Sequence, residues 1–524
     1  MSRYRIGTLV TAAGAGLLAA GAGVAASALV AASFTGVPSP LESVGNAVID
    51  LAPAVVKDVA VETFGTADKA VLLSGIYLVI AAAAALAGVV GLRRPRLALW
   101  MTAGLGALAV AAGATDRTSM LAGPLTALPA VVALVVSVLT LGWLLAVLGR
   151  QERTDSTPWW EPHPGDDVGA DFDRRRFLQA VLVTGGVVAA AAVGTRLLGS
   201  AAAVASRARV RLPPATDGAG VVPAGAELDV RGITPYLTPN DDFYRIDTAL
   251  SPPDVPTDTW TLRVHGMVDN PLTLDFTDLL RRRLVERRIT LTCVSNEVGG
   301  DLIGNATWIG VPLADLLNEA GVDAGADALL STSADGFTAG TPLAAVTDGR
   351  DAIVAVGMNG EPLPIVHGFP ARMVVPGLYG YVSATKWVTD IEVTRFADFE
   401  AYWTSRGWAE EGPIKTAARI DVPAAEAELD AGRHAVAGVA WAQTRGIAKV
   451  EVRVDDGDWA DARLGAQDGQ DTWRQWVYEW DAAPGRHTVQ VRATDRTGST
   501  QTSDQAPPRP DGATGWPSRT VTVS

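Results

Sequence analysis

The sequence predicts a chain in three parts: an N-terminal all-α region of five transmembrane helices, a domain of mixed α and β structure, and a C-terminal all-β immunoglobulin-like sandwich. The first 200 of the 524 residues contain long apolar blocks. Charged residues make up only 19% of the chain, against about 25% in soluble proteins, and the mean hydropathy is +0.20. After Val230, short alternating segments between turns replace the apolar blocks, as is typical of β-strands.

Five apolar runs approach or exceed the roughly 20 residues that an α-helix needs to cross a bilayer. They are Ile6–Ser33, Val71–Leu92, Leu97–Ala114, Leu121–Leu148 and Phe177–Leu198. Arginines gather before the first run, between the second and third, and before the fifth, which places these segments in the cytoplasm. We therefore predict a multi-pass cell-membrane protein in contact with lipid, with a cytoplasmic N-terminus and an extracytoplasmic C-terminal half. No histidine lies in the runs and no charge lies mid-helix, so neither an intramembrane b-type haem nor an ion path is expected.

The segment before the fifth run carries a motif of its own, Asp173-Arg174-Arg175-Arg176-Phe177-Leu178-Gln179. It resembles a twin-arginine export signal, in which two arginines precede a Phe-Leu pair and a weakly apolar helix. Ordinary positive-inside charge is the alternative explanation. Because the twin-arginine route carries folded proteins, the motif favours a cofactor in the exported part.

Charge and cysteine content exclude several classes of protein. The net charge is −14, which is a poor match for phosphate backbones, so no nucleic-acid partner is expected. Cys293 is the only cysteine. A single cysteine excludes intrachain disulfides, zinc sites of the CxxC type, cysteine-ligated iron–sulfur clusters and c-type haem attachment.

We expect a four-helix region in residues 1–150, a cytoplasmic loop in 151–173, the fifth helix with its signal in 174–199, and a linker in 200–229. The mixed domain then covers 230–412 and the sandwich 413–524. Leu313, Leu316 and Leu317 line one stripe of a short predicted helix. Period-two alternation predicts strands, which are contained in Thr261–Phe276, Arg288–Cys293, Ala448–Trp459, Trp473–Trp480 and His487–Asp495.

Cys293 ends one of these predicted strands, and the polar, glycine-rich turn Val294–Gly300 follows it. A buried structural thiol is the plain interpretation, since free cysteine is among the most buried residues. The glycines, however, let a large ligand approach the backbone, and a thiolate there suits a soft metal.

Four blocks carry a resemblance to the sulfite oxidase family of molybdopterin enzymes, which extends from about Ile233 to the C-terminus. They are Thr238–Asp247, Ile289–Asn296, Met358–Trp387 and the predicted sandwich. The resemblance implies an α+β sulfite-oxidase-like molybdopterin domain, a molybdenum–molybdopterin cofactor and a C-terminal domain that often forms a dimer contact. It makes Cys293 the metal ligand and catalytic residue. The cofactor-binding residues that it implies are Tyr244, Arg245, Asp335, His367, Arg372, Ser383, Ala384, Thr385 and Lys386.

The chain departs from the family around the substrate. The arginine expected five residues after the ligand cysteine is Val298, and Trp408 stands near the position of the active-site tyrosine. Arg519, in the last predicted strand, is a candidate substrate arginine. A pocket that has lost cations is less suited to a dianion such as sulfite, and it favours a neutral or singly charged oxo-acceptor.

The sequence therefore predicts a membrane-anchored, sulfite oxidase-like enzyme that transfers an oxygen atom in a two-electron reaction. Its partners would be a small oxo-donor or oxo-acceptor and a separate electron carrier, either a cytochrome or a quinone-linked protein. A homodimer through the C-terminal domain is a further expectation. The alternatives are a sulfoxide or N-oxide reductase of the same family, and a non-catalytic cell-surface binding module.

Overall fold

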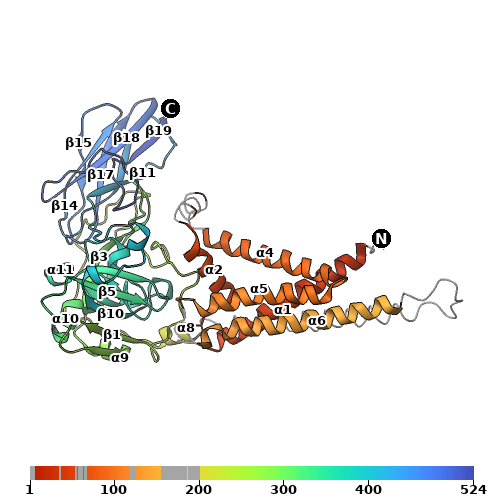
Figure 1. Ribbon diagram of the computed structural model, residues 1–524. Coiled ribbons are helices and arrows are strands. Elements are labelled where there is room, and N and C mark those ends of the chain that lie inside the picture. The colour runs from red at the N-terminus through yellow and green to blue at the C-terminus, as the bar shows by residue number, and fades with distance from the viewer. Residues whose placement is uncertain are drawn as a thin grey trace. The chain divides into compact units, whose positions relative to one another are not determined.

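The computed structural model describes residues 6–34, 37–53, 56, 63, 68–118, 124–154, 186 and 201–524 (Figure 1). The predicted fifth helix, Phe177–Leu198, and the Arg174–Arg175 motif lie outside the described residues. The chain divides into two compact units. The first contains residues 1–202 with the short segments 248–254 and 334–336, and the second contains the remainder.

The first unit is helical. Its elements are α1 (Ile6–Ala32), α2 (Pro40–Leu51), α4 (Asp68–Gly91), α5 (Pro95–Ala114), the 3-10 helix η2 (Pro124–Ala127) and α6 (Leu128–Thr154). Four stretches of the described residues are long and apolar enough to cross a membrane, namely Thr8–Ala32, Lys69–Gly91, Pro95–Ala114 and Leu125–Leu148. These stretches agree with the first four predicted helices and support membrane anchoring.

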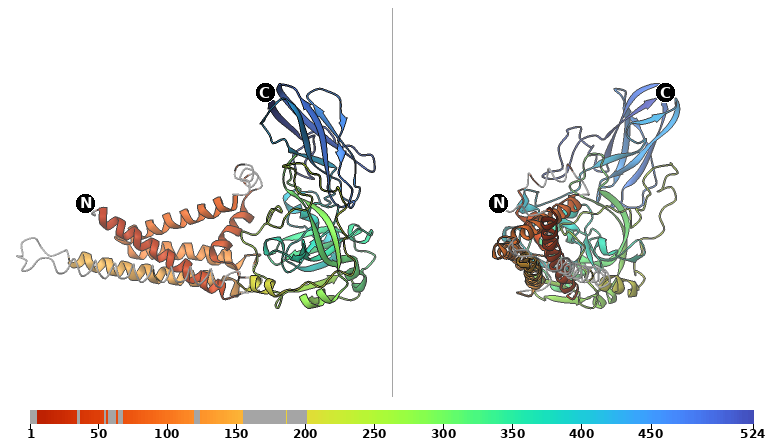
Figure 2. Two further views of the ribbon diagram at one scale, coloured as in Figure 1. Left: turned by 180° about the vertical axis from the view of Figure 1, so that it is seen from behind. Right: turned by 90° about the vertical axis from the view of Figure 1, so that its right-hand side faces the viewer.

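Small residues let two of these helices pack closely. A Cβ on Gly16 of α1 would lie 1.9 Å from the carbonyl oxygen of Ala84 in α4, and one on Gly88 of α4 would lie 2.0 Å from that of Ala12. Glycine is required at both positions, as is common where membrane helices touch backbone to backbone. Figure 2 shows the long helices of this unit side by side.

Two segments expected to be irregular contain helices. Helix α2 lies in the predicted loop between the first two membrane spans, and a capping box between Ser39 and Glu42 starts it. Helix α8 (Ala201–Arg209) begins the predicted linker 200–229. Arg207 of α8 donates to the carbonyl oxygens of Pro362 and Leu363, both at 2.8 Å. Tertiary contact therefore stabilises a helix that its weak local periodicity did not predict.

The first part of the second unit contains two sheets. One has the order β2-β1-β10-β5-β6, and the other has the order β3-β4-β7-β8, with β9 paired to β7. The strands are β1 (Thr261–Gly266), β2 (Leu272–Asp275), β3 (Val285–Thr292), β4 (Ile303–Pro312), β5 (Ala328–Ser333), β6 (Thr338–Pro342), β7 (Ile353–Met358), β8 (Glu361–Pro362), β9 (Arg372–Val374) and β10 (Val388–Thr394). Short helices connect them: α9 (Phe276–Arg281), α10 (Leu313–Ala320), α11 (Ala344–Thr347), η3 (Ile365–His367), α12 (Gly380–Ser383), η4 (Phe396–Asp398) and η5 (Thr404–Arg406).

Several predicted elements of this domain are confirmed. Strands β1 and β2 pair antiparallel within Thr261–Phe276, and β3 ends at Thr292, next to Cys293. Helix α10 buries its leucine stripe and ends at Gly321, whose φ is +70°. Trp308 and Phe369 are fully buried in the core between β3, β4 and β7.

The C-terminal part of the second unit is built of two β-sheets. One sheet has the order β11-β13-β17-β16 and the other the order β12-β19-β18-β14-β15. The core between them includes Trp476 and Trp480. The strands are β11 (Ala417–Val422), β12 (Ala427–Leu429), β13 (Gly432–Trp441), β14 (Ile447–Val454), β15 (Ala460–Asp461), β16 (Arg463–Leu464), β17 (Arg474–Ala482), β18 (Gly485–Asp495) and β19 (Ser518–Val523). The strands predicted in Ala448–Trp459, Trp473–Trp480 and His487–Asp495 are therefore confirmed.

Candidate functional site

Cys293 lies directly after β3, and its side chain is buried, with 9% of the residue exposed. Its backbone N–H donates to the carbonyl oxygen of Leu302 at 2.9 Å, and its own carbonyl accepts from the N–H of Asn296 at 3.1 Å. The Asn296 side chain accepts in turn from the Leu302 N–H at 2.9 Å. The turn after the cysteine is therefore held by its own hydrogen bonds, which fixes the position of the thiol.

The C-terminal domain holds the strand that carries Cys293. Trp473 donates its backbone N–H to the Thr290 hydroxyl at 2.7 Å, and the Gln443 side chain donates to the Thr290 carbonyl at 2.9 Å. Thr290 also donates to the buried Asn305 side chain at 3.0 Å. Because these polar groups are buried and paired, the end of β3 has little freedom to move.

Burial raises the pKa of the Cys293 thiol. A bound metal cation would reverse this effect, because a coordinating thiol is deprotonated by the ion's charge. Among the described residues, no group of three or more His, Cys, Asp or Glu side chains could hold a metal ion.

Arg372 is a buried cation on β9, with 6% of the residue exposed. Its guanidinium donates to the carbonyl oxygens of His367 at 3.2 Å and Ala384 at 3.3 Å, and lies over the Trp308 ring. In the described part of the chain, no carboxylate is within ion-pair distance, and burial lowers the pKa of Arg372 to about 10. A buried guanidinium paired only with carbonyls is suited to receive an anion such as a phosphate.

A glycine brings the neighbouring segments together. Gly368 has a φ of +111°, and a Cβ there would lie 3.0 Å from Cβ of Arg372 and 3.2 Å from Cα of Lys386. His367, just before it, is 3% exposed, and its Nε2 lies 2.8 Å from the Asn240 carbonyl oxygen. The structure therefore brings together His367, Arg372 and Lys386, three of the predicted cofactor residues.

Burial, with the Arg372 charge nearby, lowers the pKa of His367 to about 4 from its usual 6.5. Between these values the unfolded chain binds a proton at this histidine and the folded chain does not. Stability therefore falls as the pH drops from 6.5, and the loss reaches about 3 kcal/mol near pH 4.

We expect the thermal midpoint of the full chain to fall less between pH 7 and pH 4.5 in His367→Gln than in the unchanged protein. His487→Gln is the control: the hydrogen bond to Asp455 raises the pKa of His487, so removing this histidine should not reduce the fall. Equal slopes for all three proteins would contradict a buried neutral His367.

The second predicted cation, Lys386, forms an ion pair with Asp247, whose side chain is 1% exposed. Arg245 contacts the same carboxylate, with Nε 2.5 Å from Oδ2. Asp247 is the last residue of the block Thr238–Asp247, and the sequence predicts no role for it. Its position two residues after Arg245 was the only local signal available.

Ser383, Ala384 and Thr385 lie next to this cluster, but the hydroxyls of Ser383 and Thr385 are turned into the protein. Ser383 Oγ donates to the carbonyl oxygen of Tyr379 at 2.9 Å, and Thr385 Oγ1 is 2.8 Å from Ser331 Oγ. The Ala384 carbonyl accepts from Arg372. Through these contacts the three residues position the backbone around Arg372.

Tyr244 stacks on Phe243, with 5.2 Å between the ring centroids. Burial raises the pKa of the Tyr244 hydroxyl. The nearby Cys293 raises this pKa further, and the positive charge of Arg372 lowers it. Tyr244 is thus electrostatically close to both the thiol and the guanidinium.

Asp335 is 3% exposed and belongs to the first compact unit, where Thr248 donates to it at 3.4 Å. Its predicted contact with a pterin edge stays a prediction.

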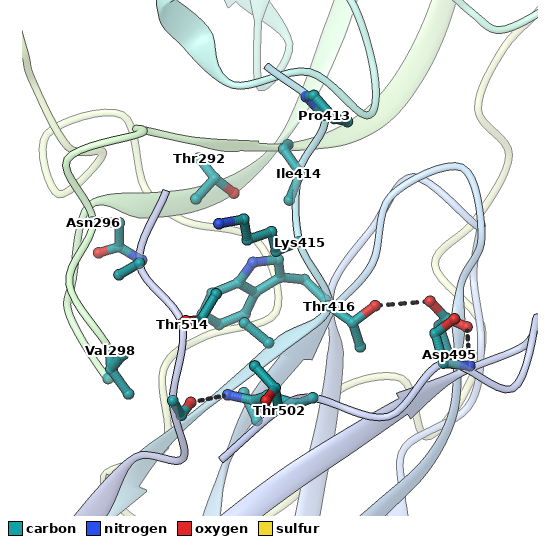
Figure 3. A pocket seen from close by; sticks show the side chains of 18 of the residues that line it. Thr292, Asn296, Val298, Pro413, Ile414, Lys415, Thr416, Asp495, Thr502 and Thr514 are labelled. Carbon is teal, nitrogen blue, oxygen red and sulfur yellow. Dashed lines mark hydrogen bonds between the residues drawn. The ribbon is translucent and has the colours of Figure 1, made fainter. Parts of the chain in front are cut away.

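A cavity of about 380 Å³ lies where the turn after Cys293 meets the segment 413–418 and the C-terminal loops (Figure 3). Thr292, Asn296 and Val298 form one side, and the Lys415 side chain extends toward Thr292 and Asn296. The rest of the wall mixes hydroxyl groups with apolar side chains such as Ile414 and Trp441. The hydroxyls come from Tyr379, Thr416, Ser499, Thr500, Thr502 and Thr514.

Both cations of the cavity wall are already paired. Lys415 Nζ lies 2.9 Å from Asp511, and Arg445 Nε lies 2.9 Å from Asp495. Glu297 adds a further carboxylate to the lining. The cavity therefore has no excess of positive charge, and its wall is partly apolar.

The two candidate substrate residues lie elsewhere. Trp408 packs against Tyr381 and Trp403, with ring centroids 6.0 and 6.2 Å away, and does not line the cavity. Arg519 lies on β19 opposite Val489, within the five-stranded sheet of the C-terminal domain, and is also absent from the cavity lining. Lys415 and Tyr379 were not predicted from the sequence, because only the folded chain brings segment 413–418 to the end of β3.

Comparison with known proteins places this site in a family. The oxidoreductase molybdopterin binding domain matches residues 249–403. The mitochondrial sulfite oxidase of Drosophila melanogaster is 30% identical over 305 residues, which cover 50% of this chain and 52% of that protein. The uncharacterized oxidoreductase YuiH of Bacillus subtilis is 33% identical over 153 residues, 29% of this chain and 74% of YuiH.

Among solved structures, the crystal structure of the sulfane dehydrogenase SoxCD from Paracoccus pantotrophus is 26% identical, with a TM-score of 0.47 over 52% of this chain and 76% of that chain. The chain spans about half the length of the mitochondrial sulfite oxidases that it matches. The matched domain contains Cys293, His367, Arg372 and Lys386. The chain belongs to the sulfite oxidase family of molybdopterin-binding oxidoreductases.

Proposed function

We propose that this protein is a membrane-anchored, extracytoplasmic enzyme that transfers an oxygen atom in a two-electron reaction. A single pterin and Cys293 would hold its molybdenum. The observation that carries the proposal is the presence in one domain of a fixed, buried thiol and a buried guanidinium, Arg372, whose hydrogen bonds go only to carbonyl oxygens among the described residues. The molybdenum–pterin group, when bound, would supply the redox chemistry, and the protein would place it and shape the pocket.

The side chains fit the group. Cys293 offers one soft ligand, which suits a metal that a dithiolene already holds. Arg372, Lys386 and Arg245 would supply positive charge to the phosphate end of the pterin. The close approach at Gly368 brings two of these cations to one place.

The cavity of Figure 3 is our candidate for the substrate path, because Thr292 and Tyr379 line it. Thr292 directly precedes Cys293, and the Tyr379 hydroxyl is close enough to the thiol for the two to interact electrostatically. Burial raises the pKa of Tyr379 to about 12, so this hydroxyl stays protonated and can donate a hydrogen bond to a substrate oxygen. The paired cations and the mixed wall of hydroxyl and apolar groups favour a neutral or singly charged oxo-compound. This observation supports the second candidate, a sulfoxide or N-oxide reductase, over oxidation of sulfite.

The remaining parts have proposed roles of their own. The four apolar helices would join the fifth predicted span in the membrane, with the N-terminus in the cytoplasm. The C-terminal two-sheet domain would be an immunoglobulin-like module, which offers a surface for a homodimer. Electrons would leave through a separate cytochrome or quinone-linked protein. The buried thiol of Cys293 and the buried guanidinium of Arg372 argue against the remaining alternative, a non-catalytic binding module.

Metal and pterin analysis of the full chain, purified from a host that makes the cofactor, tests the proposal directly. Near-stoichiometric molybdenum is the expected result, together with faster reduction of sulfoxides or N-oxides than oxidation of sulfite. Absence of molybdenum would refute the enzyme assignment at this site. Faster sulfite oxidation would refute the second candidate.

Val298→Arg should make the cavity accept a dianion. A guanidinium facing the substrate supplies a charge-assisted hydrogen bond, so KM for sulfite should fall by about tenfold or more. The uncharged enlargement Val298→Leu is the control and should not improve sulfite binding. If Val298→Arg leaves KM for sulfite unchanged, the substrate path lies elsewhere.

A further inference from the structure

Asp247 is the most enclosed carboxylate in the cluster of predicted cofactor residues, with 1% of its side chain exposed. It contacts two cations, one with each oxygen. Oδ2 accepts from Arg245 Nε at 2.5 Å, and Oδ1 forms an ion pair with Lys386. The two cations come from distant parts of the sequence, so Asp247 is the group that links them.

The Asp247 carboxylate neutralises the charge of a largely buried Lys386. The Lys386 side chain is only 12% exposed, and Nζ also donates to the Val366 carbonyl at 3.4 Å and lies over the Trp387 ring. A buried ammonium that loses its carboxylate is strongly destabilised or changes position. The Arg245 side chain is 40% exposed, so water could replace the lost carboxylate as its hydrogen-bond partner more readily.

The charges of the cluster match a phosphate monoester. Arg245, Arg372 and Lys386 bring three positive charges, Asp247 brings one negative charge, and His367 is neutral at pH 7 because its pKa is about 4. Two net positive charges remain. A phosphate monoester carries about −1.5 to −2 near neutral pH.

We infer that Asp247 is a positioning residue: it holds Lys386 and Arg245 in the orientation that receives the phosphate end of the pterin, and it balances the third positive charge. The inference rests on the proposed function, because it assigns the cluster to that phosphate. Asp247 would act only through the two cations and would not touch the phosphate itself.

The test is Asp247→Asn in the full chain, produced in a host that makes the cofactor. The amide keeps the shape and removes the charge, so Lys386 loses its fixed position. We expect the bound pterin to be released about tenfold faster than from the unchanged protein, with molybdenum content reduced in parallel. Far-UV circular dichroism should stay unchanged.

Glu451→Gln is the matched control. Glu451 also contacts two cations, one with each oxygen, namely Lys449 Nζ at 2.8 Å and Arg492 Nε at 2.9 Å, and its side chain is 11% exposed, in the C-terminal domain. It should cost stability without changing pterin release. If both variants release pterin equally fast, the effect of Asp247 is general destabilisation and the inference is wrong.

Asp247→Glu keeps the charge but moves the carboxylate by one methylene, and it covers the case in which the asparagine variant does not fold. We expect its rate of pterin release to lie between that of the unchanged protein and that of Asp247→Asn. Release as slow as in the unchanged protein, in every Asp247 variant that folds, would overturn the inference while leaving the proposed function intact. An unchanged protein that itself contains no pterin would refute the proposed function, and the inference with it.

Discussion

Replacing Cys293 with serine is expected to suppress oxygen-atom transfer by about a hundredfold or more while much of the molybdenum stays bound. The pterin dithiolene would still hold the metal without the cysteine. A hydroxyl or alkoxide donates less electron density than a thiolate, and even changes outside the ligand set of a metal commonly cost about 10- to 100-fold. Turnover and metal content are measured on the same preparation.

The structure indicates that this variant folds. Cys293 stands just after β3, whose end is fixed by Thr290 and the C-terminal domain, and serine is close to cysteine in size. Ser295→Ala is the comparison variant: it keeps the thiol and removes only a hydrogen bond from the Ser295 side chain to Cys293, so turnover should fall far less than in Cys293→Ser. Unchanged turnover in Cys293→Ser would make Cys293 a structural thiol. Loss of folding would favour a purely structural role in the core.

Arg372→Ala should have the second large effect, a loss of cofactor retention. Charge-assisted hydrogen bonds contribute about 1.5–3 kcal/mol each, so removing a bidentate contact to phosphate should weaken retention by about a hundredfold or more. Arg372→Lys should restore retention only in part, because an ammonium lacks the planar fork. Pterin and molybdenum per chain are the measured quantities.

Arg474→Ala is a matched control for Arg372→Ala. Arg474 also donates only to carbonyl oxygens among the described residues, Gly465 at 2.8 Å and Ile447 at 3.1 Å, but it lies in the C-terminal domain. Burial lowers its pKa, as it does for Arg372. Full occupancy in Arg372→Ala, or equal loss in both variants, would show that Arg372 has no specific role at the phosphate.

Local patterns in the sequence were enough for the elements whose residues signal their own environment. Four apolar runs became helices α1, α4, α5 and η2–α6, because a membrane span must satisfy its backbone within one segment. The alternation Ile289, Leu291, Cys293 placed the cysteine at the end of a strand, and β3 ends there. The matched blocks also identified His367, Arg372 and Lys386, which the structure brings together.

Only the tertiary structure decided how those residues are paired and what faces the ligand. Whether Ser383 and Thr385 point outward depends on Tyr379 and Ser331, which accept or share their hydrogen bonds. Asp247 meets Lys386 across a long stretch of sequence. The cavity combines the turn after β3 with segment 413–418 and the C-terminal loops. Periodicity reports which face of a segment is buried, but burial and charge pairing between distant segments arise only when the chain packs, and those contacts determine the site.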